Sequence, residues 1–222
     1  MTYTHVLDGQ KLDLPIGKVV CVGRNYADHA KELNNPVPTS PILFIKPASA
    51  VVPMEPEFSI PTQQGECHHE LEMSLLIGQG LCNATAEQAK QAVLGYGLGL
   101  DLTLRDVQAT LKQKGHPWEI AKGFDGACPL SVFCSTEKLA NPENTPLQLK
   151  VNGRLRQSGS SADMITPVFE LVAYTSRIFT LHPGDVVLTG TPAGVAALVP
   201  GDQLELTLAD QLLCRTQVVG QN

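Results

Sequence analysis

Two glutamates, Glu70 and Glu72, lie two positions apart in a segment whose other residues are typical of a β-strand. In an extended chain alternate side chains point to the same face, so these two carboxylates lie side by side. Leu71, Met73 and Leu75 point to the other face, which is apolar enough to be buried. Buried carboxylates repel each other unless a positive charge lies between them, and a hard divalent cation with oxygen ligands would supply that charge. The alternative is a solvated strand face, because exposed glutamates are common.

A third carboxylate, Asp101, ends the glycine-rich segment 95–101. This segment predicts a buried strand whose backbone approaches its neighbours closely. With Glu70 and Glu72, Asp101 would form an oxygen-only site that is open to water or substrate, and such a site favours Mg²⁺ or Mn²⁺. Zinc is less favoured, because the two neighbouring histidines alternate across the strand and the nearest cysteine has no partner cysteine.

His29 and Glu32 form a second candidate pair, three residues apart in segment 24–33. A short helix would place both side chains on one face, where they can touch. A histidine oriented by a carboxylate can act as a general base. A polar surface turn of helix is the alternative interpretation of this pair.

Apolar runs and turn signals predict the elements that position these residues. Strands are predicted at residues 18–22, 43–46, 70–77, 95–101, 147–151, 154–156, 186–189 and 204–208, and helices at 24–33, 85–93, 104–114 and 167–179. Thr85 opens a capping box, Asn152 and Gly153 favour a tight hairpin turn, and Thr166 is expected to cap the last helix. Ile178 belongs to the predicted buried stripe of that helix. Residues 53–61 contain three prolines and predict an irregular excursion.

Composition predicts a single α+β domain, richer in strand than in helix, over residues 1–222, with 1–17 as a short lead-in. The chain is 43% hydrophobic and 17% charged, enough for a sizeable core. A net charge of −6 without a Lys/Arg cluster argues against a nucleic-acid surface. No apolar run reaches the ~20 residues that span a membrane. The six cysteines form no CxxC pair and the N-terminus does not resemble a signal peptide, so a cytoplasmic protein with reduced thiols is expected.

From about Val19 to Val218 the chain resembles the fumarylacetoacetate hydrolase family. The resemblance is carried by ordered motifs along the whole span: Gly23-Arg24-Asn25-Tyr26, Phe44-Ile45-Lys46-Pro47, His69-Glu70-Leu71-Glu72, Leu100 to Asp106, Lys122-Gly123-Phe124-Asp125, Val151-Asn152-Gly153, and Pro183 to Val195. The chain is similar to the single-domain branch, which includes acylpyruvases and oxaloacetate-processing enzymes.

The resemblance implies a mixed β-roll or sandwich with a few peripheral helices, usually as a homodimer. It implies that Mg²⁺ or Mn²⁺ is held by Glu70, Glu72 and Asp101. It also implies that His29 and Glu32 activate water and that Lys122 stabilises oxyanionic charge. Further residues are expected near the metal or substrate: Arg24, Lys46, Arg105, Gln108 and Thr191.

The function expected from this site is metal-dependent hydrolysis of the C–C bond of acylpyruvates (2,4-dioxo acids) to pyruvate and a carboxylic acid, through an enolate. The alternatives are an oxaloacetate keto–enol tautomerase or decarboxylase and a 2-hydroxy-dienoate isomerase. All of them use enolate chemistry, and a fold does not choose among reactions. A non-catalytic metal-binding member would keep the carboxylates but lose the base. The expected partner is a small anionic 2-oxo acid, with neither nucleic acid nor membrane.

Overall fold

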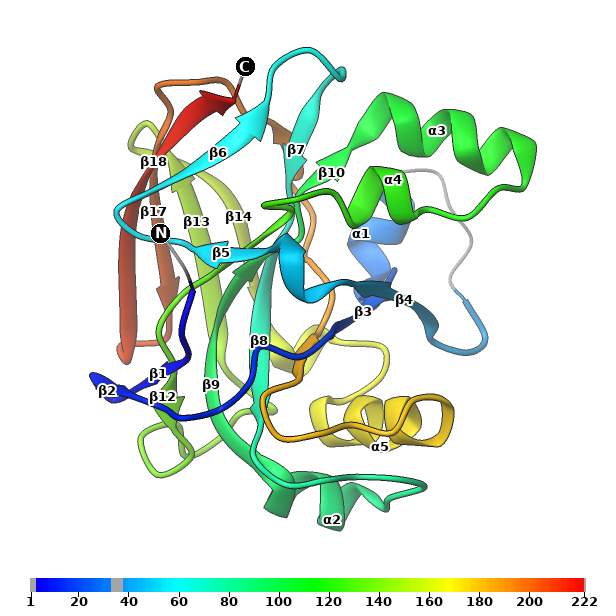
Figure 1. Ribbon diagram of the computed structural model, residues 1–222, viewed down its shortest axis with the longest axis vertical. Coiled ribbons are helices and arrows are strands. Elements are labelled where there is room, and N and C mark those ends of the chain that lie inside the picture. The colour runs from blue at the N-terminus through cyan, green and yellow to red at the C-terminus, as the bar shows by residue number, and fades with distance from the viewer. Residues whose placement is uncertain (1–2, 33–37, 222) are drawn as a thin grey trace.

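Two sheets form most of the computed structural model, which describes residues 3–32 and 38–221 (Figure 1). The larger sheet has the strand order β4-β3-β15-β8-β9-β11-β5, and β12 pairs with β9 beside this path. Its strands are β3 (Val19–Gly23), β4 (Ile42–Lys46), β5 (Val51–Pro53), β8 (Leu71–Ile77), β9 (Val93–Leu100), β11 (Cys128–Leu130), β12 (Cys134–Ser135) and β15 (Val186–Leu188). The sheet is mixed, because β15 runs parallel to β3 and β11 runs parallel to β5.

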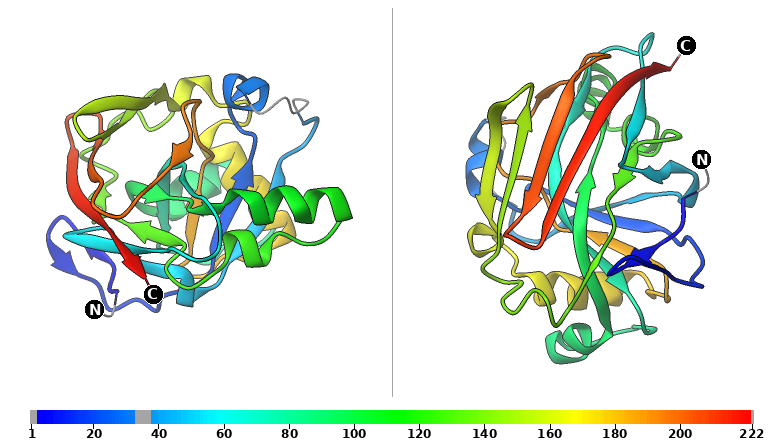
Figure 2. Two further views of the ribbon diagram at one scale, coloured as in Figure 1. Left: turned by 90° about the horizontal axis from the view of Figure 1, so that it is seen from above. Right: turned by 90° about the vertical axis from the view of Figure 1, so that its left-hand side faces the viewer.

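The second sheet has the order β14-β13-β17-β18-β6 and packs on the first through β13 against β8 and β17 against β9. Figure 2 (right) looks onto this sheet, with β18 in red and β17 in orange. Its strands are β6 (Glu57–Pro61), β13 (Pro146–Val151), β14 (Arg154–Ser160), β17 (Gln203–Leu208) and β18 (Leu212–Gln221). Short strands complete the fold: β1 (Val6–Leu7), β2 (Gln10–Lys11), β7 (Cys67–His69), β10 (Thr103–Leu104) and β16 (Ala196–Ala197).

Both faces of β8 are buried, which accounts for the position of the core. Leu71, Met73 and Leu75 join the main hydrophobic cluster between the two sheets. On the other face Leu76 joins a second cluster, against which apolar residues of segment 3–16 pack. The solvated strand face considered for the glutamates is therefore wrong, because the chain covers this side of the sheet as well.

The predicted close approach along β9 is confirmed. A Cβ atom on Gly97 would lie 2.9 Å from both the Phe133 ring and Ser74 Oγ. One on Gly99 would lie 2.7 Å from a methyl group of Leu188. These glycines let neighbouring side chains pack directly on the backbone of β9.

The helices lie at two places. Near one end α2 (Ala86–Ala92) and α5 (Val168–Ile178) pack on each other, and α1 (Ala27–Glu32), α3 (Arg105–Lys114) and α4 (Glu119–Lys122) lie on the side away from β17 and β18 (Figure 1). Single 3₁₀ turns span Ala48–Ala50 and Ser161–Asp163. The capping box is confirmed, since the Gln88 N–H donates to Thr85 Oγ1 at 3.2 Å and the Thr85 N–H donates to Gln88 Oε1 at 2.9 Å. The strand-rich α+β class is confirmed, and the single-domain boundary at 1–222 stays a prediction.

The prediction that residues 53–61 are irregular is wrong. Glu57–Pro61 form β6, an edge strand parallel to β18, with Phe58 and Ile60 buried on one face. The three prolines lie outside the strand or at its last residue, so none removes a hydrogen bond from its middle.

Two expectations for the last helix are also wrong. Thr166 does not cap α5, because Pro167 takes the cap position and the Thr166 carbonyl accepts from the Asn25 amide at 3.1 Å. Ile178 is 58% exposed, because it lies in the last turn, where the buried stripe has ended. Residues 33–37, which are the last residue of the predicted helix 24–33 and the four that follow it, lie outside the described residues.

Candidate active site

The pairing of β8 with β9 brings the three predicted metal ligands together. These strands are antiparallel, with Leu71 opposite Leu100. Glu70 lies just before β8 and Asp101 just after β9, so they face each other at the end of the ladder, where the Asp101 N–H donates to Glu70 O at 2.9 Å. Glu72 lies on the same face two residues further on. One carboxylate oxygen from each of the three residues lies within 4.8 Å of the others.

Glu72 is buried without a cationic partner. It is 1% exposed, and no ion pair joins it to a lysine or arginine in the part of the chain that the structure describes. Its Oε2 accepts a hydrogen bond from the Gly190 N–H at 2.6 Å. Gly190 has a φ of +90°, and a Cβ atom there would lie 2.7 Å from Asn25 Cβ, so glycine is required for this approach.

The other two carboxylates are each held by two cations. Lys122 Nζ lies 2.9 Å from Glu70 Oε2 and 2.6 Å from Asp101 Oδ2. Lys46 Nζ lies 2.7 Å from Asp101 Oδ1, and Arg105 pairs with Glu70 Oε1. Both lysines are almost fully buried. Burial of these charges is tolerated because each has an opposite charge within contact distance.

The pKa values of the two glutamates shift in opposite directions. Burial acts to raise the pKa of Glu70, but the positive charges of Lys122 and Arg105 outweigh it and hold this pKa below its usual value. Burial raises the pKa of Glu72 well above its usual value, and the negative charges of Asp101 and Glu70 raise it further. Positive charge is therefore lacking at Glu72.

This donor set fits a divalent metal ion. All three donors are carboxylate oxygens, the ligands that Mg²⁺ and Mn²⁺ prefer. A cation beside Glu72 would supply the positive charge that its surroundings lack. Glu70, Glu72 and Asp101 would hold the ion, and all three line a small cavity of about 30 Å³.

Helix α1 places His29 next to Glu32, as predicted. His29 is 5% exposed, and its Nδ1 lies 3.3 Å from Glu32 Oε2. The N–H of Gly194 donates to the same carboxylate at 3.0 Å and fixes it from the other side. A carboxylate only accepts hydrogen bonds, so Nδ1 of the neutral ring carries the proton and Nε2 carries the lone pair of a base.

The cavity above the triad is lined by most of the predicted site residues. Nine of them form its wall: Arg24, His29, Glu70, Glu72, Asp101, Arg105, Gln108, Lys122 and Thr191. The two others act from behind the wall, because Lys46 contacts Asp101 and Glu32 contacts His29. The structure thus brings the predicted residues together, while their roles stay predictions.

Five further residues of the wall were missed by the sequence analysis: Val22, Gly23, Phe44, Lys112 and Trp118. The Phe44 and Trp118 rings meet edge to face with their centroids 5.9 Å apart. Lys112 Nζ lies 5.2 Å from the centroid of the Trp118 ring. Lys112 had a sequence signal, because it follows Gln108 by four residues and must share its helix face. Trp118 is the only tryptophan of the chain, which was a weaker signal.

A model of the family described as "Fumarylacetoacetate (FAA) hydrolase C-terminal" matches residues 18–219. The chain belongs to the fumarylacetoacetate hydrolase family. The resemblance found in the sequence motifs is thereby confirmed, over almost the same span of residues.

The relatives that are similar to this chain do not all carry the same activity. Oxaloacetate tautomerase YcgM of Escherichia coli strain K12 is 52% identical over 204 residues, which are 91% of this chain and 93% of that protein. The mitochondrial oxaloacetate tautomerase FAHD1 of Bos taurus is 45% identical over 84% of this chain and 85% of its own. The solved structure of fumarylpyruvate hydrolase from Pseudomonas aeruginosa, in complex with Mn²⁺ and pyruvate, has a TM-score of 0.92 and 38% identity, covering 99% and 97% of the two chains.

Membership of the fumarylacetoacetate hydrolase family confirms the predicted fold, a mixed β-roll or sandwich, and an enzymatic function. None of the helices within residues 3–32 and 38–221 is long and apolar enough to cross a membrane. All six cysteines are free thiols, as predicted. Burial raises the pKa of Cys67, three residues before the first ligand, to about 12, so this thiol stays protonated and inert.

A buried glutamine that the sequence did not indicate connects the ligand strand to the loop of Thr191. Gln157 Oε1 accepts from the Leu71 N–H at 3.0 Å and from His69 Nδ1 at 2.8 Å. Its Nε2 donates to Thr191 Oγ1 and to Pro192 O, both at 2.8 Å. Because Thr191 Oγ1 accepts this bond, its hydroxyl proton can be donated to a ligand.

Replacing Gln157 with leucine is expected to lower the free energy of unfolding by about 2–4 kcal/mol. The change leaves several buried polar groups without partners, and each costs about 1–3 kcal/mol. Denaturant unfolding measures the loss. The matched control is Gln217→Leu, at an exposed strand position of β18. Equal losses in the two variants would contradict a special role for the buried amide.

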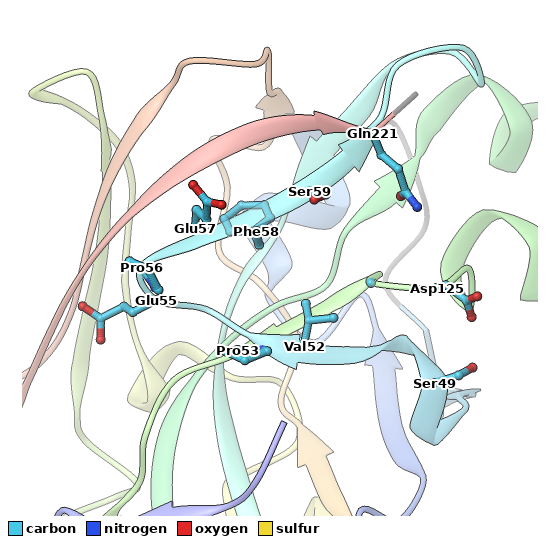
Figure 3. A pocket seen from close by; sticks show the side chains of 11 residues that line it. Ser49, Val52, Pro53, Glu55, Pro56, Glu57, Phe58, Ser59, Asp125 and Gln221 are labelled. Atoms are coloured by element: carbon cyan, nitrogen blue, oxygen red, sulfur yellow. The ribbon is translucent and has the colours of Figure 1, made fainter. Parts of the chain in front are cut away.

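A larger cleft lies elsewhere, between β5, β6 and the loop at Asp125 (Figure 3). Its volume is about 550 Å³, and three acidic residues line it: Glu55, Glu57 and Asp125. No lysine, arginine or histidine is among the lining residues. Such a cleft repels an anionic substrate, so the smaller cavity above the triad is the candidate active site.

Proposed function

We propose that this member of the fumarylacetoacetate hydrolase family catalyses the keto–enol tautomerisation of oxaloacetate with Mg²⁺ or Mn²⁺. The 52% identity with the E. coli oxaloacetate tautomerase, over nine-tenths of both chains, supports this reaction over the hydrolysis that was first expected. A tautomerase needs one group that moves a proton and a set of positive charges that stabilise an enolate.

The charge around the triad is the observation that carries the proposal. Five side-chain cations, Lys46, Lys122, Arg105, Arg24 and Lys112, stand against four carboxylates, which are the triad and Glu32. The site is therefore cationic even before a divalent ion is counted. Field lines in a cavity with low-dielectric walls are focused, so the site attracts a small dianion such as oxaloacetate.

In this site His29 would move the proton. Its Nε2 takes a proton from C3 of the keto form, and the resulting imidazolium, paired with Glu32, returns one to the oxygen at C2. Lys122 adds a fixed positive charge near the same oxygen. A bound divalent ion supplies a Lewis acid that polarises the 2-oxo group.

Hydrolysis of acylpyruvates is the second candidate. The His29–Glu32 pair supports it, because a base oriented by a carboxylate also activates water. The similarity to a fumarylpyruvate hydrolase points the same way. The two reactions differ in whether water reaches the base, and measurement of products separates them.

Freshly dissolved enol-oxaloacetate is expected to lose its enol absorbance faster with protein and Mg²⁺ than with Mg²⁺ alone. EDTA should abolish the acceleration, and proton NMR should show keto-oxaloacetate as the product. Pyruvate formed faster than in the Mg²⁺ blank would instead establish a decarboxylase. Acetate and pyruvate from acetylpyruvate, without enol turnover, would establish the hydrolase and overturn the proposal.

We extend the proposal to the partners. The small anionic 2-oxo acid is supported by the cationic cavity, and the absence of a nucleic-acid surface by the net charge of −6. The homodimer and the cytoplasmic location stay predictions; sedimentation equilibrium tests the first and cell fractionation the second.

A further inference from the structure

One face of α3 carries three polar side chains into the cavity. Arg105, Gln108 and Lys112 follow one another at spacings of three and four residues, and all three line the wall. Arg105 pairs with Glu70 at the floor. Lys112 lies two turns further, about 10 Å along the helix axis. Helical side chains lean toward the N-terminus, so Lys112 leans back toward the floor.

Lys112 has no anionic partner in residues 3–32 and 38–221, whereas the cations at the floor each pair with a carboxylate. The remaining residues contain no aspartate or glutamate that could pair with it. Arg24 also lines the cavity without an ion pair to any described residue. Two cations of the wall are therefore left for a ligand.

Aromatic packing holds Lys112 at the wall. Its Nζ lies 5.2 Å from the Trp118 ring centroid, and Trp118 is fixed edge-on against Phe44. Lys112 is an exposed residue, but partial desolvation against the wall lowers its pKa, and the positive charges of Arg24 and Arg105 lower it further. A bound anion would offset this repulsion between like charges.

Arg24 is held at the wall by its backbone. Its φ of +61° lies in the left-handed region, which arginine seldom adopts. The next residue, Asn25, fixes this conformation, since its amide donates to Thr189 O at 2.9 Å and to Thr166 O at 3.1 Å. Strained residues of this kind are common at binding sites.

We propose that Lys112 and Arg24 form a second anion site, the outer carboxylate site, which binds the distal carboxylate of a four-carbon 2-oxo diacid. The inference rests on the proposed function and deepens it, because it makes Lys112 a determinant of specificity. A substrate of equal length that ends in a methyl group leaves both cations unpaired. The outer carboxylate site thus selects oxaloacetate over monocarboxylate 2-oxo acids.

Two unreactive ligands test this inference on the Mg²⁺-loaded protein. Malate and 2-hydroxybutanoate share the 2-hydroxy acid group and differ at the fourth carbon, which is a carboxylate in one and a methyl in the other. Calorimetric titration gives their Kd values. Lys112→Met keeps the aliphatic stem and removes the charge. Lys114→Met is the matched control, because Lys114 is exposed on the same helix and is not part of the wall.

Lys112→Met is expected to raise the Kd of malate about 10- to 100-fold, the effect of losing a hydrogen bond to a charged group. The Kd of 2-hydroxybutanoate should change less than about twofold, and Lys114→Met should change neither. An unchanged malate Kd in Lys112→Met, or a wild type that does not distinguish the ligands, overturns the outer carboxylate site. A wild type that binds malate through Lys112 yet does not tautomerise oxaloacetate overturns the proposed function and supports the outer carboxylate site.

Discussion

Replacing Glu72 with glutamine is expected to lower metal-dependent turnover at least about 100-fold, because the Lewis acid and its charge supply several kcal/mol of transition-state stabilisation. Glutamine keeps the size of the side chain and still accepts from the Gly190 N–H. The fold should survive, since Glu72 is the ligand without a lysine or arginine partner among the described residues. Asp101 is a poorer choice, because its removal takes a partner from both Lys46 and Lys122.

Melting temperatures with Mg²⁺ and with EDTA separate loss of metal from loss of fold. Wild-type protein should melt higher in Mg²⁺, as any ligand of the folded state requires, and Glu72→Gln should lose most of this difference. Glu66→Gln, at an exposed carboxylate outside the cavity, is the matched control. A full Mg²⁺ effect in Glu72→Gln would exclude Glu72 as a ligand.

In EDTA, the difference in stability between the wild type and Glu72→Gln is expected to depend on pH. Because the folded-state pKa of Glu72 is raised, the folded state holds its proton to a higher pH than the unfolded state does. The stability of the wild type relative to Glu72→Gln should therefore fall as pH rises above the usual carboxyl range. Urea unfolding at several pH values measures this difference, and a difference that rises with pH would contradict the assigned shift.

Replacing His29 with asparagine is expected to lower turnover of oxaloacetate by about 10²- to 10⁴-fold, the usual contribution of a general base. Asparagine can still hydrogen-bond to Glu32, but it cannot carry the proton. His29 is outside the ligand set, so the Mg²⁺-dependent rise in melting temperature should persist. Deuterium exchange at C3 of oxaloacetate in D₂O, corrected for the metal-only rate, measures the loss.

His182→Ala is the control for His29, because His182 is exposed and does not line the cavity. Its exchange rate should equal that of the wild type. If His29→Asn exchanges deuterium within tenfold of the wild-type rate, another group moves the proton.

The positions of the three carboxylates could be predicted because local rules decide them. Alternation along an extended chain places Glu70 and Glu72 on one face, and Asp101 ends a strand whose glycines are legible in the sequence. The pair of His29 and Glu32 follows from helical spacing in the same way. The cationic residues of the site follow no helix or strand periodicity, and they could be predicted only from the resemblance to a family.

The features that escaped prediction depend on contacts distant in sequence. Gln157 lies in a hairpin strand like any polar residue, and only tertiary pairing places it beside Leu71 and Thr191. β6 was not predicted, because the prolines near it suggested an irregular segment. They lie outside the strand or at its last residue, positions that an edge strand tolerates. Thr166 looked like a cap, but its N–H and its carbonyl both bond to the Asn25 side chain, which holds it outside the helix.

The proposed metal ligands and the proposed base and specificity residue belong to different layers of the molecule. Glu70, Glu72 and Asp101 stand on or next to the β8–β9 ladder in the centre of the core, whereas His29 and Lys112 stand on helices outside the sheets (Figure 1). Substitutions on those helices can exchange the base or the specificity without disturbing the ligand geometry. One inherited ligand scaffold can thus serve relatives that tautomerise, hydrolyse or isomerise, and new activities can arise in this lineage at little cost to folding.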